Sequence, residues 1–154
     1  MNRKTILGIS LLLIAVFAIG SVSALDFGSL MGGDENETVT IDGIDFNLPK
    51  GYTEDPNHET VNETNHQGTV TYITNGKLFE KGNSIINILV ADYGDFKVTD
   101  DIVSNAGDEA KTINGVNGYM SQKEQFYVFS YAKNDKLVVL SANNEDAISD
   151  FIIG

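Results

Sequence analysis

The segment Gln125–Ala142 reads QFYVFSYAKNDKLVVLSA, and it decides the fold. Two runs rich in aromatic and β-branched residues, 125–132 and 136–142, flank a short polar turn at 133–135. Such side chains pair well across neighbouring strands, and asparagine and aspartate tolerate the positive φ that tight hairpin turns require. The segment therefore predicts the best antiparallel hairpin in the chain.

Further strands are predicted upstream of this hairpin. Apolar residues alternate with polar ones over 38–41 and 44–48, on either side of the two-residue loop Asp42-Gly43, which is a strong hairpin signal. Residues 84–93 form an almost continuous apolar run, which is typical of a strand covered on both faces. Weaker patterns predict strands over 69–74, 78–79, 112–113 and 116–120, with turns at Asn75-Gly76 and Asn114-Gly115.

Two helices are predicted to cover the sheet. Thr99 can cap a short helix that has Asp100 and Asp101 in its first turn and ends at Gly107. A closing helix begins after Asn143 or Asn144, and its apolar stripe consists of Ala147, Ile148, Phe151 and Ile152. The predicted fold is therefore α+β, a single domain with a mostly antiparallel sheet, one short mid-chain helix and a C-terminal helix.

The N-terminal segment has the layout of a secretory signal peptide. Arg3 and Lys4 precede the apolar run 6–19, and Val22 and Ala24 occupy the −3 and −1 positions of a cleavage site. We expect residues 1–24 to be the signal peptide, 25–37 a flexible tether and 38–154 the domain. An uncleaved membrane anchor is the alternative, although the apolar run is shorter than the ~20 residues that span a bilayer.

The composition limits the kind of partner. After cleavage eight lysines face 22 acidic side chains, which is a net charge of −14, and no arginine remains. Because nucleic-acid binding needs a basic surface, a nucleic-acid partner is not expected, and neither is a membrane span after cleavage. Cysteine is absent, so the exported domain must hold together by packing alone, which suits a prokaryotic exterior.

The polar stretch 51–67 is predicted to be a long, weakly ordered loop. It contains both histidines, and the cluster His58, Glu59, Glu63 and His66 is the sharpest metal candidate, for zinc or copper. Their spacing matches no established metal motif, so a solvated loop is the favoured interpretation. A serine hydrolase would have to take its base from this loop, and the chain has no Gly-x-Ser-x-Gly motif. No catalytic residue and no cofactor are therefore assigned.

Calcium is the second candidate metal. The acidic residues Asp92, Asp95, Asp100 and Asp101 lie close in sequence, but they lack the ligand order of a calcium-binding loop. Placement at a helix N-terminus explains Asp100 and Asp101 sufficiently.

Two Asn-x-Thr sequons are candidate glycosylation sites. Asn36 begins the triplet Asn-Glu-Thr, and Asn62 begins a second one of the same sequence. Given export, either asparagine is a possible acceptor for a glycan.

Several motifs carry a resemblance to a known group of proteins. These are 46–52 (FNLPKGY), 112–119 (TINGVNGY), 129–131 (FSY) and 136–138 (KLV). Through them the chain resembles an uncharacterised family of small exported proteins of methanogenic archaea, over nearly all of its mature region. The motifs look structural, so the resemblance transfers no catalytic or binding residue. More distantly, the order of elements is similar to the Mog1/PsbP-like α/β sandwich.

These observations favour a noncatalytic extracytoplasmic binding or cell-envelope interaction module. Its partner would be an envelope protein or an extracellular ligand, and its location secreted or envelope-associated, or membrane-anchored if the signal is not cleaved. The alternative is a secreted hydrolase or metal-dependent enzyme that uses the segment from His58 to His66 or unpaired carboxylates.

Overall fold

The computed structural model describes residues 37–154. The predicted signal peptide, the tether except for Glu37, and the sequon asparagine Asn36 lie outside this part. Nine strands and two short helices are described, in this order: β1 (Glu37–Ile41), β2 (Ile44–Leu48), β3 (Thr53–Gln67), β4 (Val70–Lys81), β5 (Ser84–Asp92), α2 (Asp100–Val103), β6 (Glu109–Ile113), β7 (Val116–Lys123), β8 (Phe126–Lys133), β9 (Lys136–Ala142) and α3 (Glu145–Phe151).

Seven strands form one antiparallel sheet. Their order is β3-β4-β5-β9-β8-β7-β6, so β3 and β6 are its edges, while β1 and β2 form a separate hairpin. The fold-deciding hairpin pairs Phe129 with Leu140 and Lys133 with Lys136, as its alternation predicts. The expectation of a mostly antiparallel sheet is confirmed, whereas the α+β label has only loose support, since the two helices contain four and seven residues.

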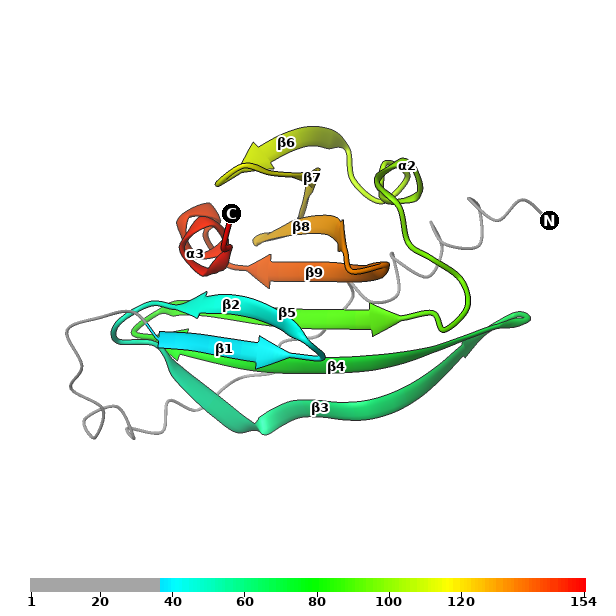
Figure 1. Ribbon diagram of the computed structural model, residues 1–154. Coiled ribbons are helices and arrows are strands. Elements are labelled where there is room, and N and C mark those ends of the chain that lie inside the picture. The colour runs from blue at the N-terminus through cyan, green and yellow to red at the C-terminus, as the bar shows by residue number, and fades with distance from the viewer. Residues whose placement is uncertain (1–36) are drawn as a thin grey trace.

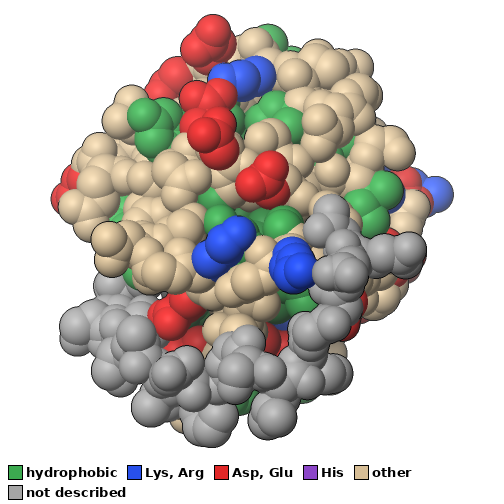
Figure 2. Space-filling model, turned by 90° about the vertical axis from the view of Figure 1, so that its left-hand side faces the viewer, with side chains coloured by type: hydrophobic (Ala, Val, Ile, Leu, Met, Phe, Trp, Pro, Cys, Tyr) green, Lys and Arg blue, Asp and Glu red, His purple; other side chains and the backbone are tan. Residues whose placement is uncertain are grey.

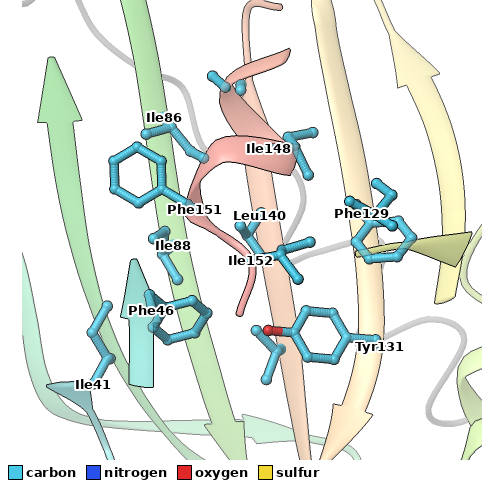
Figure 3. Close-up of a cluster of buried hydrophobic side chains, with 14 of the residues drawn as sticks. Ile41, Phe46, Ile86, Ile88, Phe129, Tyr131, Leu140, Ile148, Phe151 and Ile152 are labelled. Carbon is cyan, nitrogen blue, oxygen red and sulfur yellow. The ribbon is translucent and has the colours of Figure 1, made fainter. Parts of the chain in front are cut away.

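The sheet is covered on both faces. The β1–β2 hairpin and α3 pack on one face, where Phe151 lies beside Ile86 and Phe46 beside Ile88, as Figure 3 shows. On the other face, Val98 of the loop before α2 and Val103 of α2 belong to one buried cluster with Leu89 and Val139, and α2 contacts β7 and β8. Figure 1 shows α3 and α2 at opposite ends of the sheet. Because alternate residues of β5 and β9 enter opposite cores, both strands are nearly continuous apolar runs.

The predicted turns at Asp42-Gly43 and Asn114-Gly115 are confirmed, and the turn predicted over 133–135 is present but shorter, because Lys133 belongs to β8 and pairs with Lys136. Asp42-Gly43, Asn114-Gly115 and Asn134-Asp135 have positive φ at both central residues, which is the geometry that matches the twist of the flanking strands. Lys136 fastens the first turn to the sheet, because its Nζ lies 3.1 Å from Asp42 Oδ2 and donates to the Asp42 carbonyl oxygen.

The predicted turn at Asn75-Gly76 is wrong, because β4 runs through it without interruption. Gly76 has no positive φ; it is needed for close packing instead. A Cβ at this position would lie 2.3 Å from Leu89 Cδ2 and 2.7 Å from the Ile88 carbonyl oxygen. Glycine inside a strand often marks such a close approach, and the sequence alone did not distinguish this role from a turn.

The predicted loop at 51–67 is also wrong, since residues 53–67 form β3. This strand pairs only with β4 in the described sheet and is exposed over most of its length. Without a buried face it has no apolar alternation, which is why its polar sequence reads as a loop. Pro56 is compatible with an edge strand because its missing N–H is not needed in the ladder.

The two helices agree with their predictions to different degrees. Asn144 is the N-cap of α3, and its Oδ1 accepts the Ala147 N–H at 2.8 Å. The buried stripe Ala147, Ile148 and Phe151 is confirmed. In contrast, α2 ends at Val103 rather than near Gly107, and the Thr99 side chain makes no cap hydrogen bond.

Candidate functional site

The most distinctive feature of the surface is the irregular edge strand β3. Its pairing with β4 is regular over 53–55 and 63–67, but the register shifts between Asp55 and Thr60 and again between Thr60 and Glu63. These shifts place extra residues in β3, and such bulges bend a strand and interrupt its ladder. Bulges, a proline and charged side chains are the usual means of protecting a long edge from unwanted pairing.

Beyond the second bulge the β3–β4 hairpin extends past the rest of the sheet. The last residue of β5, Asp92, pairs with Ile73, so the hairpin residues 65–72 have no third strand beside them. Figure 1 shows this hairpin end reaching beyond β5. We call residues 61–75 the arm.

One face of the arm is anchored to the sheet. Tyr72 is buried and stacks on Tyr93, with ring centroids 4.9 Å apart and planes inclined by 26°. Tyr93 in turn contacts the edge of Phe96 in the loop before α2. Since an isolated two-stranded hairpin is at best marginally stable, this aromatic contact fixes the arm in place. Burial and the neighbouring Glu63 carboxylate raise the pKa of Tyr72, so its phenol is neutral at ordinary pH.

The opposite face of the arm is exposed. Thr64 pairs with Ile73 and His66 with Thr71, so these four side chains share one face, which we call the arm face. All four are exposed, and His66 Nδ1 lies 3.0 Å from Thr71 Oγ1. Within residues 37–154 the exposed large hydrophobic side chains are Val61 (63%), Ile73 (41%) and Ile153 (37%). Two of these three therefore belong to the arm.

The predicted metal ligands are not brought together. His58, Glu59, Glu63 and His66 are strung along β3, and a rise of about 3.3 Å per residue places the two imidazoles on the order of 20 Å apart. The side chains of Glu59, Glu63 and His66 also have different neighbours on β4. Glu59 contacts Lys77, Glu63 pairs with Thr74, and His66 faces Thr71. No group of three or more His, Cys, Asp or Glu side chains in the described part could hold a metal ion.

A different set of titratable groups meets at the first bulge. His58 Nδ1 lies 2.7 Å from Asp55 Oδ2, and Glu80 lies beside this pair on β4. Burial works to raise the pKa of Asp55, but the Asn57 N–H and His58 outweigh it and lower that pKa. Burial and the Asp55 charge raise the pKa of Glu80, whose Oε1 is buried without a hydrogen-bond partner among the described residues.

On the same stretch of β3 two carboxylates hold one lysine. Lys77 Nζ lies 2.7 Å from Glu54 Oε1 and 3.1 Å from Glu59 Oε1. Burial works to lower the pKa of Lys77, but the two carboxylates outweigh this effect and raise it. This ion pair fastens the bulged part of β3 to β4, so Glu59 has a structural role.

Three of the four acidic residues considered as calcium ligands have local roles. Asp92 Oδ1 accepts the Gly94 N–H at 2.8 Å, and Asp92 Oδ2 lies 3.8 Å from Lys136 Nζ. Asp100 and Asp101 lie in the first turn of α2, as expected. The visible face in Figure 2 mixes acidic and lysine side chains with small, separate apolar areas.

Neither the Asp55–His58–Glu80 cluster nor the arm face was predicted from the sequence. Both depend on the pairing of β3 with β4. Because residues 51–67 were predicted to be a loop, no strand pairing, and so no cross-strand neighbour, was predicted for them. One signal was present. Thr69 to Thr74 was predicted as a strand, and an Asn-rich, Thr-rich stretch before a glycine at 68 is compatible with its hairpin partner.

Comparison with models of protein families, with curated proteins and with solved structures finds no match to this chain. In residues 37–154 no helix is both long and apolar enough to cross a membrane.

Proposed function

We propose that this protein is a noncatalytic, extracytoplasmic interaction module that contacts its partner through the arm face. The observation that carries the proposal is the anchored arm. The Tyr72–Tyr93 stack holds one face of the hairpin, while Ile73 on the opposite face is exposed to solvent. Exposed apolar side chains on a rigid support cost little ordering entropy when a partner binds.

The partner that fits this surface is a protein or peptide of the cell envelope. The arm face offers an apolar side chain, two hydroxyls and an imidazole, with no lysine among them. That set suits apolar and hydrogen-bonding contacts rather than phosphate recognition. The same proposal includes secretion or envelope association and the relation to the exported archaeal family. It also includes the relation to the Mog1/PsbP-like sandwich, which is supported by the two helices on opposite faces of the sheet.

Site-specific photo-crosslinking in the cell that makes the protein tests the proposal. A photoreactive amino acid replaces Thr71 on the arm face or, as a matched control, the exposed Thr112 on the other edge strand, β6. We expect a discrete adduct from position 71 and none of that mass from position 112. Equal adducts from both positions, or none from position 71, would contradict the arm face as the contact surface.

The second candidate is a hydrolase or metal-dependent enzyme, which the Asp55–His58 contact favours. A carboxylate on Nδ1 orients an imidazole so that Nε2 can act as base or ligand. Zinc titration by calorimetry tests the metal-dependent form of this candidate. Heat at micromolar zinc that disappears in H58A and persists in H66A would favour it, and an absence of heat would remove it.

A further inference from the structure

We propose that Asn62 is an N-glycosylation site and that its glycan protects the edge of the sheet. Asn62, Glu63 and Thr64 form the one Asn-x-Ser/Thr triplet within residues 37–154. All three residues are exposed. The inference shares its premise of export with the proposed function, but it does not depend on the arm face.

The triplet begins in a break of the ladder. Thr60 pairs with Gly76 and Glu63 with Thr74, so residues 61 and 62 of β3 stand opposite Asn75 alone. The backbone N–H of Asn62 donates to the Asn75 side-chain Oδ1 at 2.8 Å instead of to a strand partner. Asn62 therefore lies at a break in the ladder, whereas Glu63 and Thr64 of the same triplet are paired with β4 on the exposed edge of the sheet.

The backbone at Asn62 also bends away from the strand conformation. Its φ is +47°, in the left-handed region that asparagine and glycine tolerate best. This conformation forms a local turn in an otherwise extended chain. Glycine would satisfy the same backbone, so the bulge by itself does not require an amide side chain, and Asn62→Gly separates the two roles.

The reaction is a glycosyl transfer. The side-chain nitrogen of Asn62 attacks C1 of the reducing-end sugar of an oligosaccharide linked through phosphate to a polyprenyl lipid. The N–C1 bond forms as the C1–O bond breaks, the lipid phosphate leaves with the bonding electron pair, and the amide loses one proton to a base of the transferase.

A glycan on Asn62 would add to the protection that β3 already has. β3 is an edge strand of 15 residues, and its bulges, Pro56 and charged side chains limit pairing with other chains. A hydrated glycan at the second bulge would block such pairing sterically and would cover Val61, the most exposed large hydrophobic side chain of the described residues. Partners would then be directed to the arm face rather than to the edge.

Glycopeptide mass spectrometry tests the inference. The full chain is produced in a secretory host whose oligosaccharyltransferase recognises Asn-x-Ser/Thr, and the exported protein is digested and analysed. We expect a glycan on Asn62 in the wild type, in the conservative T64S and in N57Q, which changes an exposed asparagine of β3 outside any sequon. We expect its loss in N62G and T64A, with the melting temperature of unglycosylated N62G close to that of unglycosylated wild type.

A wild-type protein with no glycan on Asn62 would overturn the proposal, whatever the state of Asn36. A glycan on Asn36 alone would show that the chain reached the transferase but that Asn62, on the folded edge of the sheet, was not modified. In that case the site proposal fails while the export premise of the proposed function stands.

Discussion

Tyr72 of β4 stacks on Tyr93, which follows β5, with their ring centroids 4.9 Å apart. The stack joins the arm to the loop that carries α2, because Tyr93 also contacts Phe96. The position of the exposed arm face therefore depends on this buried aromatic contact, together with the packing of Val70 against the same cluster.

Replacing Tyr72 by alanine should loosen the arm. Removing a buried aromatic ring costs about 3 kcal/mol or more, and here the lost contact is the anchor of residues 65–72. We expect faster amide hydrogen exchange in those residues than elsewhere in the sheet. Y72F, which keeps the ring, is the matched control and should preserve slow exchange; equal exchange in Y72A and Y72F would show that the stack does not anchor the arm.

Replacing Gly76 by alanine should destabilise the protein by about 2 to 3 kcal/mol, as overpacked cores do. The new Cβ would lie 2.7 Å from the Ile88 carbonyl oxygen, which is backbone and cannot rotate away. Urea unfolding measures the change. T71A, on an exposed position of the same strand, should shift stability by less than about 0.5 kcal/mol. If G76A unfolds at the wild-type urea concentration, the close packing of β4 on β5 is incorrect.

Removing the N-cap of α3 should cost about 1 kcal/mol. Asn144 Oδ1 accepts the Ala147 N–H, and N144A deletes this acceptor while N144D keeps it. Because α3 packs Phe151 against Tyr52 and Phe79, its fraying would also expose the core on that face. Thermal unfolding should rank wild type and N144D above N144A, and a stability of N144A equal to that of N144D would exclude the cap.

The buried carboxyl of Glu80 should make stability depend on pH. Its folded pKa lies above the ordinary value of 4.5, so the folded state binds the proton more tightly than the unfolded state. The contribution of Glu80 to the free energy of unfolding is therefore fully present below the pKa that Glu80 has in the unfolded chain. This contribution is lost as the pH rises through the pKa of Glu80 in the folded protein. E80Q, which stays neutral, should melt at a higher temperature than wild type at pH 7.

The difference between E80Q and wild type should disappear at pH 4 and below. The exposed Glu109, changed to glutamine, is the control for the loss of one acidic charge from the surface. A gap between E80Q and wild type that is the same at pH 4 and pH 7 would mean that the Glu80 charge is not the cause.

Local patterns predicted most of the fold. The hairpin 126–142, its turn, the turns at Asp42-Gly43 and Asn114-Gly115, and the cap of α3 depend on neighbours in sequence, so their residues alone specify them. β3 was missed because an edge strand exposed over most of its length has no apolar alternation, and its ion pairs with Lys77 and its pairing with β4 supply the stabilisation instead. Gly76 was misread because glycine serves both turns and close packing.

The candidate site could not be predicted from local patterns for a related reason. His58 and His66 lie close in the sequence, yet the extended strand β3 separates them in space. His58 instead lies near Asp55 and Glu80, because β3 bulges at this point and pairs with β4. The arm face likewise results from register, which places Thr64 opposite Ile73. Register between distant segments is set by the whole sheet.

The most direct test of the account is quantitative co-purification of the crosslinked partner with I73D and with I153D. Both variants place a charge on an exposed isoleucine, but only Ile73 lies on the arm face. The account predicts at least a tenfold loss of partner for I73D and an unchanged yield for I153D, with both variants folded by circular dichroism. Equal yields from I73D and wild type would contradict the arm face as the binding surface.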